Sequence, residues 1–273
     1  MRAMVAVAPI FDALHAAGLN AVGVADPARW NAAVGPERRT EELAPFTRSI
    51  LVFGSGGGAL WEALLADLRA HPEHLTEELH PLDAFVRRAV AAADPGLGAA
   101  RRRWFFAAAD AELHLDFRAL ADLAGLGGRS RLGLLLHPAH GLWLGLRAAC
   151  FVDLEIPFSA PAAADPCAGC PAPCITACRG SAFVAGQWSV DRCSAFHAES
   201  TLCASNCASR EACPAAPESR YSLAEILYHY DRARGRAVLR NLVGVAEEDD
   251  GFEGIGPHWH EWRRKVNVHG ARP

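Results

Sequence analysis

Eight of the nine cysteines in this 273-residue chain fall within one short segment. They are Cys167, Cys170, Cys174, Cys178, Cys193, Cys203, Cys207 and Cys213. Four cysteine thiolates complete one 4Fe–4S cluster, so eight thiolates can hold two. The segment therefore predicts two 4Fe–4S clusters bound by these eight cysteines, and one-electron transfer as the chemistry.

The spacing of the cysteines suggests how they are shared between the clusters. In two-cluster ferredoxins the run is C-x2-C-x2-C-x3-C-P, and its last cysteine ligates the other cluster. The first four cysteines here have that shape with one extra residue, and Arg179 replaces the proline. The same crossing predicts one cluster on Cys167, Cys170, Cys174 and Cys213, and the other on Cys178, Cys193, Cys203 and Cys207.

Structural zinc and disulfides are the alternatives for these cysteines. Zinc sites favour facing C-x2-C pairs, and only Cys167 and Cys170 supply one. Disulfides conflict with the chain's start, which lacks a convincing secretory signal. The ninth cysteine, Cys150, lies in an apolar, strand-like run and is expected to be a buried, inert thiol.

Composition limits the classes of partner. Hydrophobic residues make up 51% and charged residues 21% of the chain, which is typical of a globular protein. The formal net charge of −4 makes a nucleic-acid partner unlikely, since phosphate binding needs clustered Lys and Arg. The longest apolar run, Leu132–Val152, is interrupted by His137, Pro138, His140 and Arg147, so no membrane span is predicted. We expect a cytoplasmic protein.

The apolar periodicity predicts the elements that position the cysteines. Helices are expected over 3–19, 59–71, 80–93 and 107–123, and strands over 21–25 and 48–53. Leu132–Leu136 and Leu142–Leu146 are expected to form a hairpin, with 151–156 extending the strand pattern. A glycine-rich segment, 54–58, joins a strand to a helix; a flexible turn is favoured there over a phosphate cradle. Ser222-Leu223-Ala224-Glu225 has the form of a capping box and predicts a helix start.

Several motifs make the chain resemble the epoxyqueuosine reductase family, cobalamin-dependent enzymes with a ferredoxin-like module of two clusters. The resemblance covers most of residues 15–215. It is carried by the cysteine array and by the segments Phe46–Phe53, Ala124–Gly128, Gly141–Trp143 and Val190–His197. Cobalamin-processing proteins of the CblC type share the first domain without the clusters. The resemblance implies a nitroreductase-like domain that cradles base-off cobalamin, with clusters that deliver electrons to cobalt.

The chain departs from that family at the catalytic acid. The family's acid is the Asp of a V-D-T-x-P-x-x-E-R run, and Ala111 occupies that position here. Asp110 and Glu112 beside it are the candidate catalytic residues, and Arg118 matches the Arg of the run. The family's C-terminal helical repeats, which help to hold tRNA, have no counterpart in the residues after Cys213. The resemblance therefore implies a divergent member with an altered or lost acid, and tRNA reduction is not expected.

Three residues are candidates for contact with the cofactor: Arg118, His140 and Trp143. His140 is preferred among the histidines because it lies in the turn of the expected hairpin, and an imidazole there could ligate a metal or move a proton. Most of the other histidines are expected to be turn or surface residues.

The sequence thus predicts an α+β protein in three parts: a nitroreductase-like cofactor domain (1–160), a ferredoxin-like two-cluster module (161–220) and a helical tail (221–273). Electrons from a low-potential donor of the ferredoxin or flavodoxin type would pass through the clusters to a substrate or cofactor in the first domain. Cobalamin is the candidate cofactor. The alternatives are a non-catalytic ferredoxin-like carrier, a cobalamin-handling protein, or a zinc-stabilised binding module.

Overall fold

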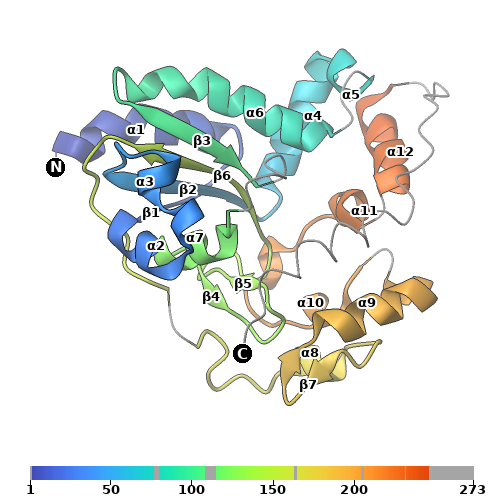
Figure 1. Cartoon of the computed structure of the whole chain (residues 1–273). Helices are drawn as coiled ribbons and strands as arrows, with labels where there is room; N and C mark the ends of the chain where they lie inside the picture. The colour runs from blue at the N-terminus through green and yellow to red at the C-terminus, as the bar shows by residue number, and fades with distance from the viewer. Residues whose placement is uncertain are drawn as a thin grey trace. The chain divides into compact units, whose positions relative to one another are not determined.

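The computed structural model describes residues 2–76, 80–107, 115–162, 165–203, 206–230 and 232–245 (Figure 1). Contacts divide the chain into two compact units. The first comprises Met1–Ala172 and Cys213–Tyr221, and the second comprises Pro173–Ala212 and Ser222–Pro273. Of the eight clustered cysteines, the first unit therefore contains Cys167, Cys170 and Cys213, and the second contains the other five.

The first unit is built on a four-stranded antiparallel sheet in the order β1-β2-β6-β3. Its strands are β1 (Ala21–Ala25), β2 (Ser49–Gly56), β3 (Arg102–Phe106) and β6 (Leu144–Val152). The two central strands are buried along most of their length, from Ile50 to Phe53 in β2 and from Ala148 to Val152 in β6. Continuous burial requires cover on both faces of the sheet.

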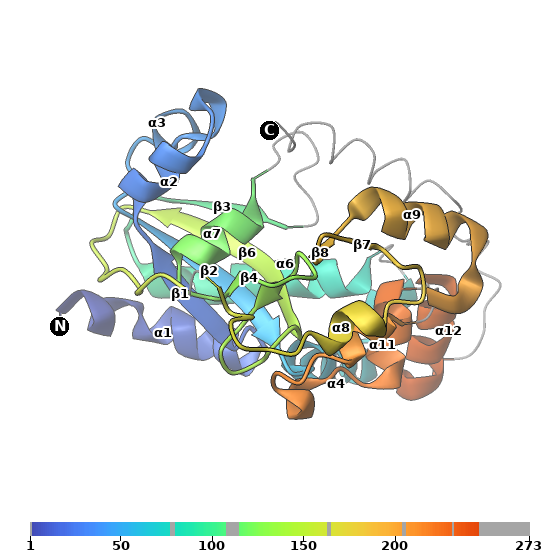
Figure 2. The same cartoon turned by 90° about the horizontal axis from the view of Figure 1, so that it is seen from below.

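Helices supply that cover, and Figures 1 and 2 show α6 and α7 on opposite sides of the sheet. On one face lie α2 (Pro27–Ala33) and α7 (Phe117–Leu123), which share a buried apolar cluster with β2 and β6. On the other lie α1 (Arg2–Ala16), α4 (Ala59–Ala70) and α6 (Pro81–Ala93). The apolar stripe of α6 is buried as its spacing predicts, at Leu82, Phe85, Val86 and Val90.

Short elements complete the first unit. They are α3 (Thr40–Leu43), α5 (Glu73–Thr76), the paired strands β4 (Gly128–Arg129) and β5 (Leu135–Leu136), and 3₁₀ turns at Pro36–Arg38, Asp94–Leu97 and Pro217–Ser219. The strand at 21–25 and the helices at 3–19, 59–71 and 80–93 are confirmed to within a few residues, and β2 extends three residues beyond the predicted 48–53.

The predicted helix over 107–123 is confirmed at 117–123, which form α7, and residues 108–114 lie outside the described residues. Helix α7 begins only at Phe117, where Asp116 Oδ1 accepts hydrogen bonds from the amides of Arg118 and Ala119 and so caps it. Residues 102–106 form β3, a strand that the apolar pattern does not predict. The arginines of β3 obscure its pattern, because Arg102 is neutralised by Asp94 and Arg103 donates to the Leu43 carbonyl.

The predicted hairpin of 132–136 with 142–146 is wrong. β5 pairs with β4, whereas β6 pairs with β2 and β3 and runs unbroken to Val152. Only the turn is as expected, since His137 and Gly141 form an isolated antiparallel bridge. Local spacing identifies apolar runs but does not identify their partners in a sheet.

The second unit begins with small elements: α8 (Pro173–Thr176), β7 (Phe183–Val184), β8 (Gln187–Trp188), α9 (Val190–Glu199), a 3₁₀ turn at Thr201–Cys203 and α10 (Ala208–Glu211). β7 and β8 form a hairpin whose turn residues, Ala185 and Gly186, both have positive φ, as a type I′ turn requires. Ser189 caps α9 by accepting a hydrogen bond from the Arg192 amide.

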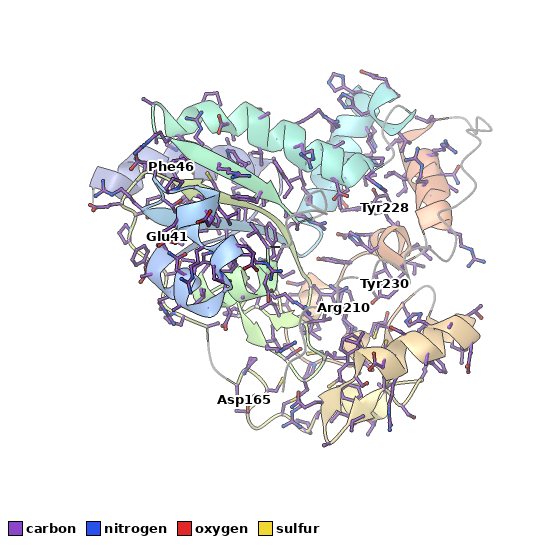
Figure 3. The ribbon with its side chains drawn as sticks, in the orientation of Figure 1. Glu41, Phe46, Asp165, Arg210, Tyr228 and Tyr230 are labelled. Carbon is purple, nitrogen blue, oxygen red and sulfur yellow. The ribbon has the colours of Figure 1, made fainter. Side chains whose placement is uncertain are left out.

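Two helices, α11 (Leu223–Tyr230) and α12 (Arg232–Val243), follow in the second unit. Ser222 Oγ accepts a hydrogen bond from the Glu225 amide, which confirms the predicted helix start. Gly235 lets α12 approach α11, because a Cβ there would lie 2.3 Å from Tyr228 Cα; Figure 3 labels Tyr228 and Tyr230 on α11. The rest of the predicted tail, 246–273, lies outside the described residues. No helix in the described part of the chain has the length and apolarity needed to cross a membrane.

Candidate functional site

One group of thiols lies in the first unit. Burial raises the pKa of the Cys213 thiol, and the neighbouring Cys167 and Cys170 thiolates raise it further; a backbone hydrogen bond from Ala215 and the charge of Arg220 act in the opposite direction. Thiolates influence one another in this way only at short range. Cys167 and Cys170 therefore lie near enough to Cys213 for their charges to interact, although Cys213 follows far along the chain.

The loop that carries the first two of these thiols is held by its own backbone. Asp165 Oδ1 accepts a hydrogen bond of 2.9 Å from the Cys167 amide, and the Cys170 amide donates to the Cys167 carbonyl at 3.1 Å. Figure 3 labels Asp165 in the segment that leads into this loop. The Asp side chain thus fixes the turn that brings Cys167 and Cys170 to one place.

A second group of thiols lies in the second unit. Burial raises the pKa of the Cys203 thiol, and Cys207 and Cys178 raise it further, whereas Arg179 lowers it. Arg179 also donates a hydrogen bond to the Leu202 carbonyl and so ties the residue after Cys178 to the residue before Cys203. The two groups, Cys167/Cys170/Cys213 and Cys178/Cys203/Cys207, each fall within one of the ligand sets that the sequence predicts.

Backbone amides approach the sulfur atoms in both groups. The Ala172 amide donates to Cys170 Sγ at 3.4 Å, and the Ala182 amide donates to Cys178 Sγ at 3.3 Å. The backbone of Ala215 makes the corresponding bond to Cys213. Amide donors stabilise a thiolate, and hydrogen bonds to the sulfurs are one of the ways in which a protein sets the potential of an iron–sulfur cluster.

These amide–sulfur contacts coincide with left-handed backbone at residues other than glycine. In the described part of the chain four such residues have positive φ, and three of them lie at or next to the donating amides: Ala172 (φ 57°), Ser181 (φ 48°) and Ala216 (φ 47°). The left-handed region is unfavourable for a residue with a Cβ, so a fold accepts it where the surrounding structure requires it. In all three places the left-handed residue stands where a backbone amide donates to a cysteine sulfur.

The donors of both groups are cysteine thiols, a ligand type that can bind an iron–sulfur cluster or a structural zinc ion. None of the nine cysteines, all of which lie in the described residues, forms a disulfide. Within the described residues, no three His, Cys, Asp or Glu side chains are placed to share a single metal ion. In a four-iron cluster each thiolate binds a different iron, so its sulfurs stand further apart than the ligands of one ion. Both groups consist of thiols alone, the ligand type that a 4Fe–4S cluster requires.

A second candidate site lies at one end of the sheet in the first unit, where β2 and β3 end and β1 and β6 begin. Asn20 and Gly56 exchange two hydrogen bonds there, of 3.0 and 2.8 Å. The Gly57 amide donates to the Trp143 carbonyl at 3.2 Å. The His140 ring rests on Gly56, because a Cβ on that glycine would lie 2.2 Å from His140 Cδ2.

His140 belongs to a turn organised by a second histidine. The rings of His137 and His140 stack at 4.9 Å, and His137 Nδ1 accepts hydrogen bonds from the amides of Ala139 and His140. His140 Nδ1 lies 3.3 Å from Ser219 Oγ, and that hydroxyl donates to the Ala139 carbonyl at 3.4 Å. Burial lowers the pKa of both imidazoles, for His137 to about 4, so both are neutral near pH 7.

The lowered pKa of His137 predicts a loss of stability in acid. Its ordinary pKa is 6.5, so the unfolded chain takes up a proton before the folded chain does; the full contribution to stability is present above pH 6.5 and is lost as the pH falls toward 4. With allowance for solvent screening the loss is on the order of 1 to 2 kcal/mol. Urea unfolding at pH 7 and pH 4.5 measures it. His137→Asn, whose amide oxygen accepts the same bonds without titrating, should show the smaller pH dependence; an equal dependence would assign it to another group.

The structure brings together only some of the residues predicted to contact a cofactor. His140 and Trp143 both lie at this end of the sheet, but Trp143 is 2% exposed and its ring packs edge-on against Tyr221 at 5.3 Å. Arg118 lies on the exposed first turn of α7. Asp110 and Glu112 lie outside the described residues. The roles of all five stay predictions.

Sequence reasoning missed Asn20 and Ser219, which hold Gly56 and His140 in place. A lone Asn before a strand and a lone Ser after the last cysteine carry no pattern of their own. The glycine-rich segment does have a pattern, that of a possible phosphate cradle. In the structure the Leu60 amide of α4 donates to Ser55 Oγ, and the Gly18 backbone packs against Ala59 and Leu60. Close packing therefore accounts for this segment.

The first unit is an antiparallel sheet with helices on both faces. The chain shares its fold with solved structures of a B12-trafficking protein and of one epoxyqueuosine reductase. The C. elegans B12-trafficking protein CblC, a human MMACHC homologue, matches with a TM-score of 0.57 and 14% identity, over 90% of this chain and 100% of that chain. Epoxyqueuosine reductase from Streptococcus thermophilus matches with a TM-score of 0.50 and 12% identity, over 86% of this chain and 78% of that chain.

The reductive dehalogenase NpRdhA matches with a TM-score of 0.45 and 16% identity, over 83% of this chain and 36% of that chain, which is too low a score to establish a shared fold. No protein-family model matches the sequence, and no curated protein matches it significantly. At these identities the likeness to CblC and to epoxyqueuosine reductase concerns the fold alone.

Proposed function

We propose that this chain is an iron–sulfur redox protein, in which two 4Fe–4S clusters pass electrons to a cofactor or substrate in the first unit. The observation that carries the proposal is the grouping of the thiols. Cys167, Cys170 and Cys213 form one group and Cys178, Cys203 and Cys207 form another, in agreement with the crossed ligand sets. Cys174 and Cys193 complete the two sets in the proposal.

The surroundings of the thiols suit one-electron chemistry. Amide–sulfur bonds of the kind seen at Cys170 and Cys178 delocalise negative charge from the ligands and help to set the cluster potential. The clusters, when bound, supply reversible one-electron transfer. The chain's own residues place the thiols, direct the amides and, by burying Cys203 and Cys213, restrict access of water to the ligands.

Cobalamin is the proposed acceptor. It is supported by the fold shared with a B12-trafficking protein and with an epoxyqueuosine reductase, and by the end of the sheet where His140 rests on Gly56. Low-potential carriers are the kind that can reduce such a cofactor, with the protein supplying proximity and orientation. A donor of the ferredoxin or flavodoxin type, a cytoplasmic setting and a catalytic role for Asp110 or Glu112 belong to the same proposal.

Anaerobic purification followed by iron and acid-labile sulfide analysis tests the clusters. Two clusters correspond to roughly eight irons and eight sulfides per chain, with an EPR signal after reduction. Zinc without iron or sulfide would contradict the proposal and favour the zinc-stabilised binding module.

A titration of the reconstituted protein with cobalamin, in oxidised and reduced forms, tests the acceptor separately. Binding is expected to change the absorption spectrum of the corrinoid, and a reduced protein is expected to reduce it. Bovine serum albumin at equal concentration controls for non-specific effects. Iron and sulfide without any spectral change of cobalamin would leave a ferredoxin-like carrier.

A further inference from the structure

Arg147 is the feature that the proposed electron path does not explain. This residue of β6 is partly buried, its Nε is fully buried without a hydrogen-bond partner, and no residue in the described ranges forms an ion pair with it. The arginines of the neighbouring strand differ. Arg102 binds Asp94, and Arg103 donates to the Leu43 carbonyl.

An unpaired guanidinium in this position is unfavourable for the protein alone. Arginine stays protonated at any ordinary pH, so it cannot relieve the cost of burial by losing its charge. Breaking or omitting the partner of a buried charge destabilises the folded state, whereas an apolar residue of similar volume is often better tolerated. A bound anion would supply the missing partner.

An irregularity in the sheet sets the position of the Arg147 side chain. The register of β2 with β6 shifts between Phe53 and Gly54, which leaves Arg147 in a β-bulge. Its guanidinium lies over Gly145, where a Cβ would be 2.8 Å from the terminal nitrogen and 3.1 Å from Cζ. Bulges re-aim side chains and are common beside functional sites. A glycine at 145 is what leaves room for the guanidinium.

A second cation lies at the same end of the sheet. Arg87 of α6 is exposed and lies over the Phe106 ring, with its Cζ 4.4 Å from the ring centroid, and within the described ranges it too has no ion pair. Phe106 is the last residue of β3 and pairs with Ala148, the neighbour of Arg147. The next amide, that of Ala107, donates to the Arg147 carbonyl at 3.0 Å.

We propose that Arg147, supported by Arg87, forms an oxyanion-binding subsite in the first unit, which takes a carboxylate or phosphate group of a ligand. The planar guanidinium fork matches two oxygens of such a group, and partial burial strengthens the interaction. Phe106 holds the second guanidinium in place through its ring face. The subsite does not depend on the iron–sulfur clusters, so its test and theirs fail separately.

Thermal unfolding of the reconstituted protein in phosphate, acetate and chloride at equal ionic strength tests the subsite. Phosphate or acetate should raise the Tm of the wild type above its value in chloride, and the anion with the larger effect identifies the source of the oxyanion. Arg147→Met should raise the Tm in chloride by about 2–4 °C, because it removes an unpaired charge, and should abolish the response to the anion. Arg87→Gln should weaken that response.

Arg101→Gln is the matched control, since Arg101 also lies over an aromatic ring, that of Phe46, but is paired with Asp153; its variant should keep the full response. The proposal is wrong if the wild type responds no more to phosphate or acetate than to chloride, if Arg147→Met responds like the wild type, or if it lowers the Tm. It is also wrong if Asp110→Asn or Glu112→Gln is strongly non-additive with Arg147→Met, which would reveal a partner within the chain.

Discussion

Cys213→Ala is expected to remove about half of the iron and acid-labile sulfide and to leave the EPR signal of one cluster, since each cluster contains four irons. Cys213 is the only member of its group that comes from beyond the second set of cysteines along the chain, and it is buried beside Cys167 and Cys170. A four-iron cluster that loses a thiolate ligand of this kind is not expected to survive anaerobic purification.

Cys207→Ala should give the complementary result. It removes a neighbour of Cys203 from the other group, so the remaining EPR signal should differ from that of Cys213→Ala, and the double variant should contain almost no iron. Identical residual signals in the two single variants would contradict the crossed assignment. Loss of both clusters in each single variant, with an unchanged circular dichroism spectrum, would contradict it as well.

Cys150→Ala is the matched control, because it removes a thiol of the same kind from outside the array. Cys150 is fully buried in β6, where burial and the charge of Asp94 raise the pKa of its thiol well above the usual range. A thiol held in its protonated form among apolar neighbours is a poor metal ligand. The variant should lose some stability through the missing sulfur atom but keep the full iron content.

Much of the fold of the first unit could be predicted from the sequence where the signal is local. The strand at Ala21–Ala25 and the helix α6 have clear apolar patterns, and both are confirmed. The prediction errors occur where residues far apart in the chain determine which segments form strands and which strands pair. β3 forms because Arg102 binds Asp94 and because β3 pairs with the edge of β6. Neither interaction can be read from the run R-R-W-F-F. Likewise, β5 pairs with β4 although β6 follows it in the chain.

The candidate site residues also fall into those that the sequence reveals and those that only the structure reveals. The eight cysteines are identifiable because their chemistry is specific to the residue type, and their spacing restricts the ligand sets. The site at the end of the sheet cannot be identified from the sequence, because its residues come from segments that are far apart in the chain. These residues are Asn20, Gly56, His140 and Ser219. In the sequence, Arg147 is only an interruption of an apolar run. An unpaired charge becomes visible only when the structure shows which arginines have partners.

Gly56→Ala is expected to destabilise the protein by about 1–3 kcal/mol, the usual cost of overpacking. The added methyl would lie 2.2 Å from His140 Cδ2 and 2.3 Å from Cγ, so the ring must leave its place. The ring cannot move alone, because its Nδ1 faces Ser219 Oγ and its amide donates to His137 Nδ1. The whole turn from His137 to Gly141 would shift. Urea unfolding at pH 7 measures the loss.

The double variant Gly56→Ala/His140→Ala separates this steric cause from any general effect of glycine. Removing the ring makes room for the methyl group, so the double variant should be less destabilised than the sum of the two single variants by about 1–3 kcal/mol, as residues in contact allow. Gly35→Ala is the control, since its backbone has φ of −65° and the three atoms nearest to its new Cβ all belong to the flexible carboxylate of Glu37. It should change stability by less than about 0.5 kcal/mol. Additive single and double variants would show that His140 does not rest on Gly56.

If His140 also faces the cofactor, Gly56→Ala should weaken cobalamin binding as much as His140→Ala does, because both remove the ring from the same position.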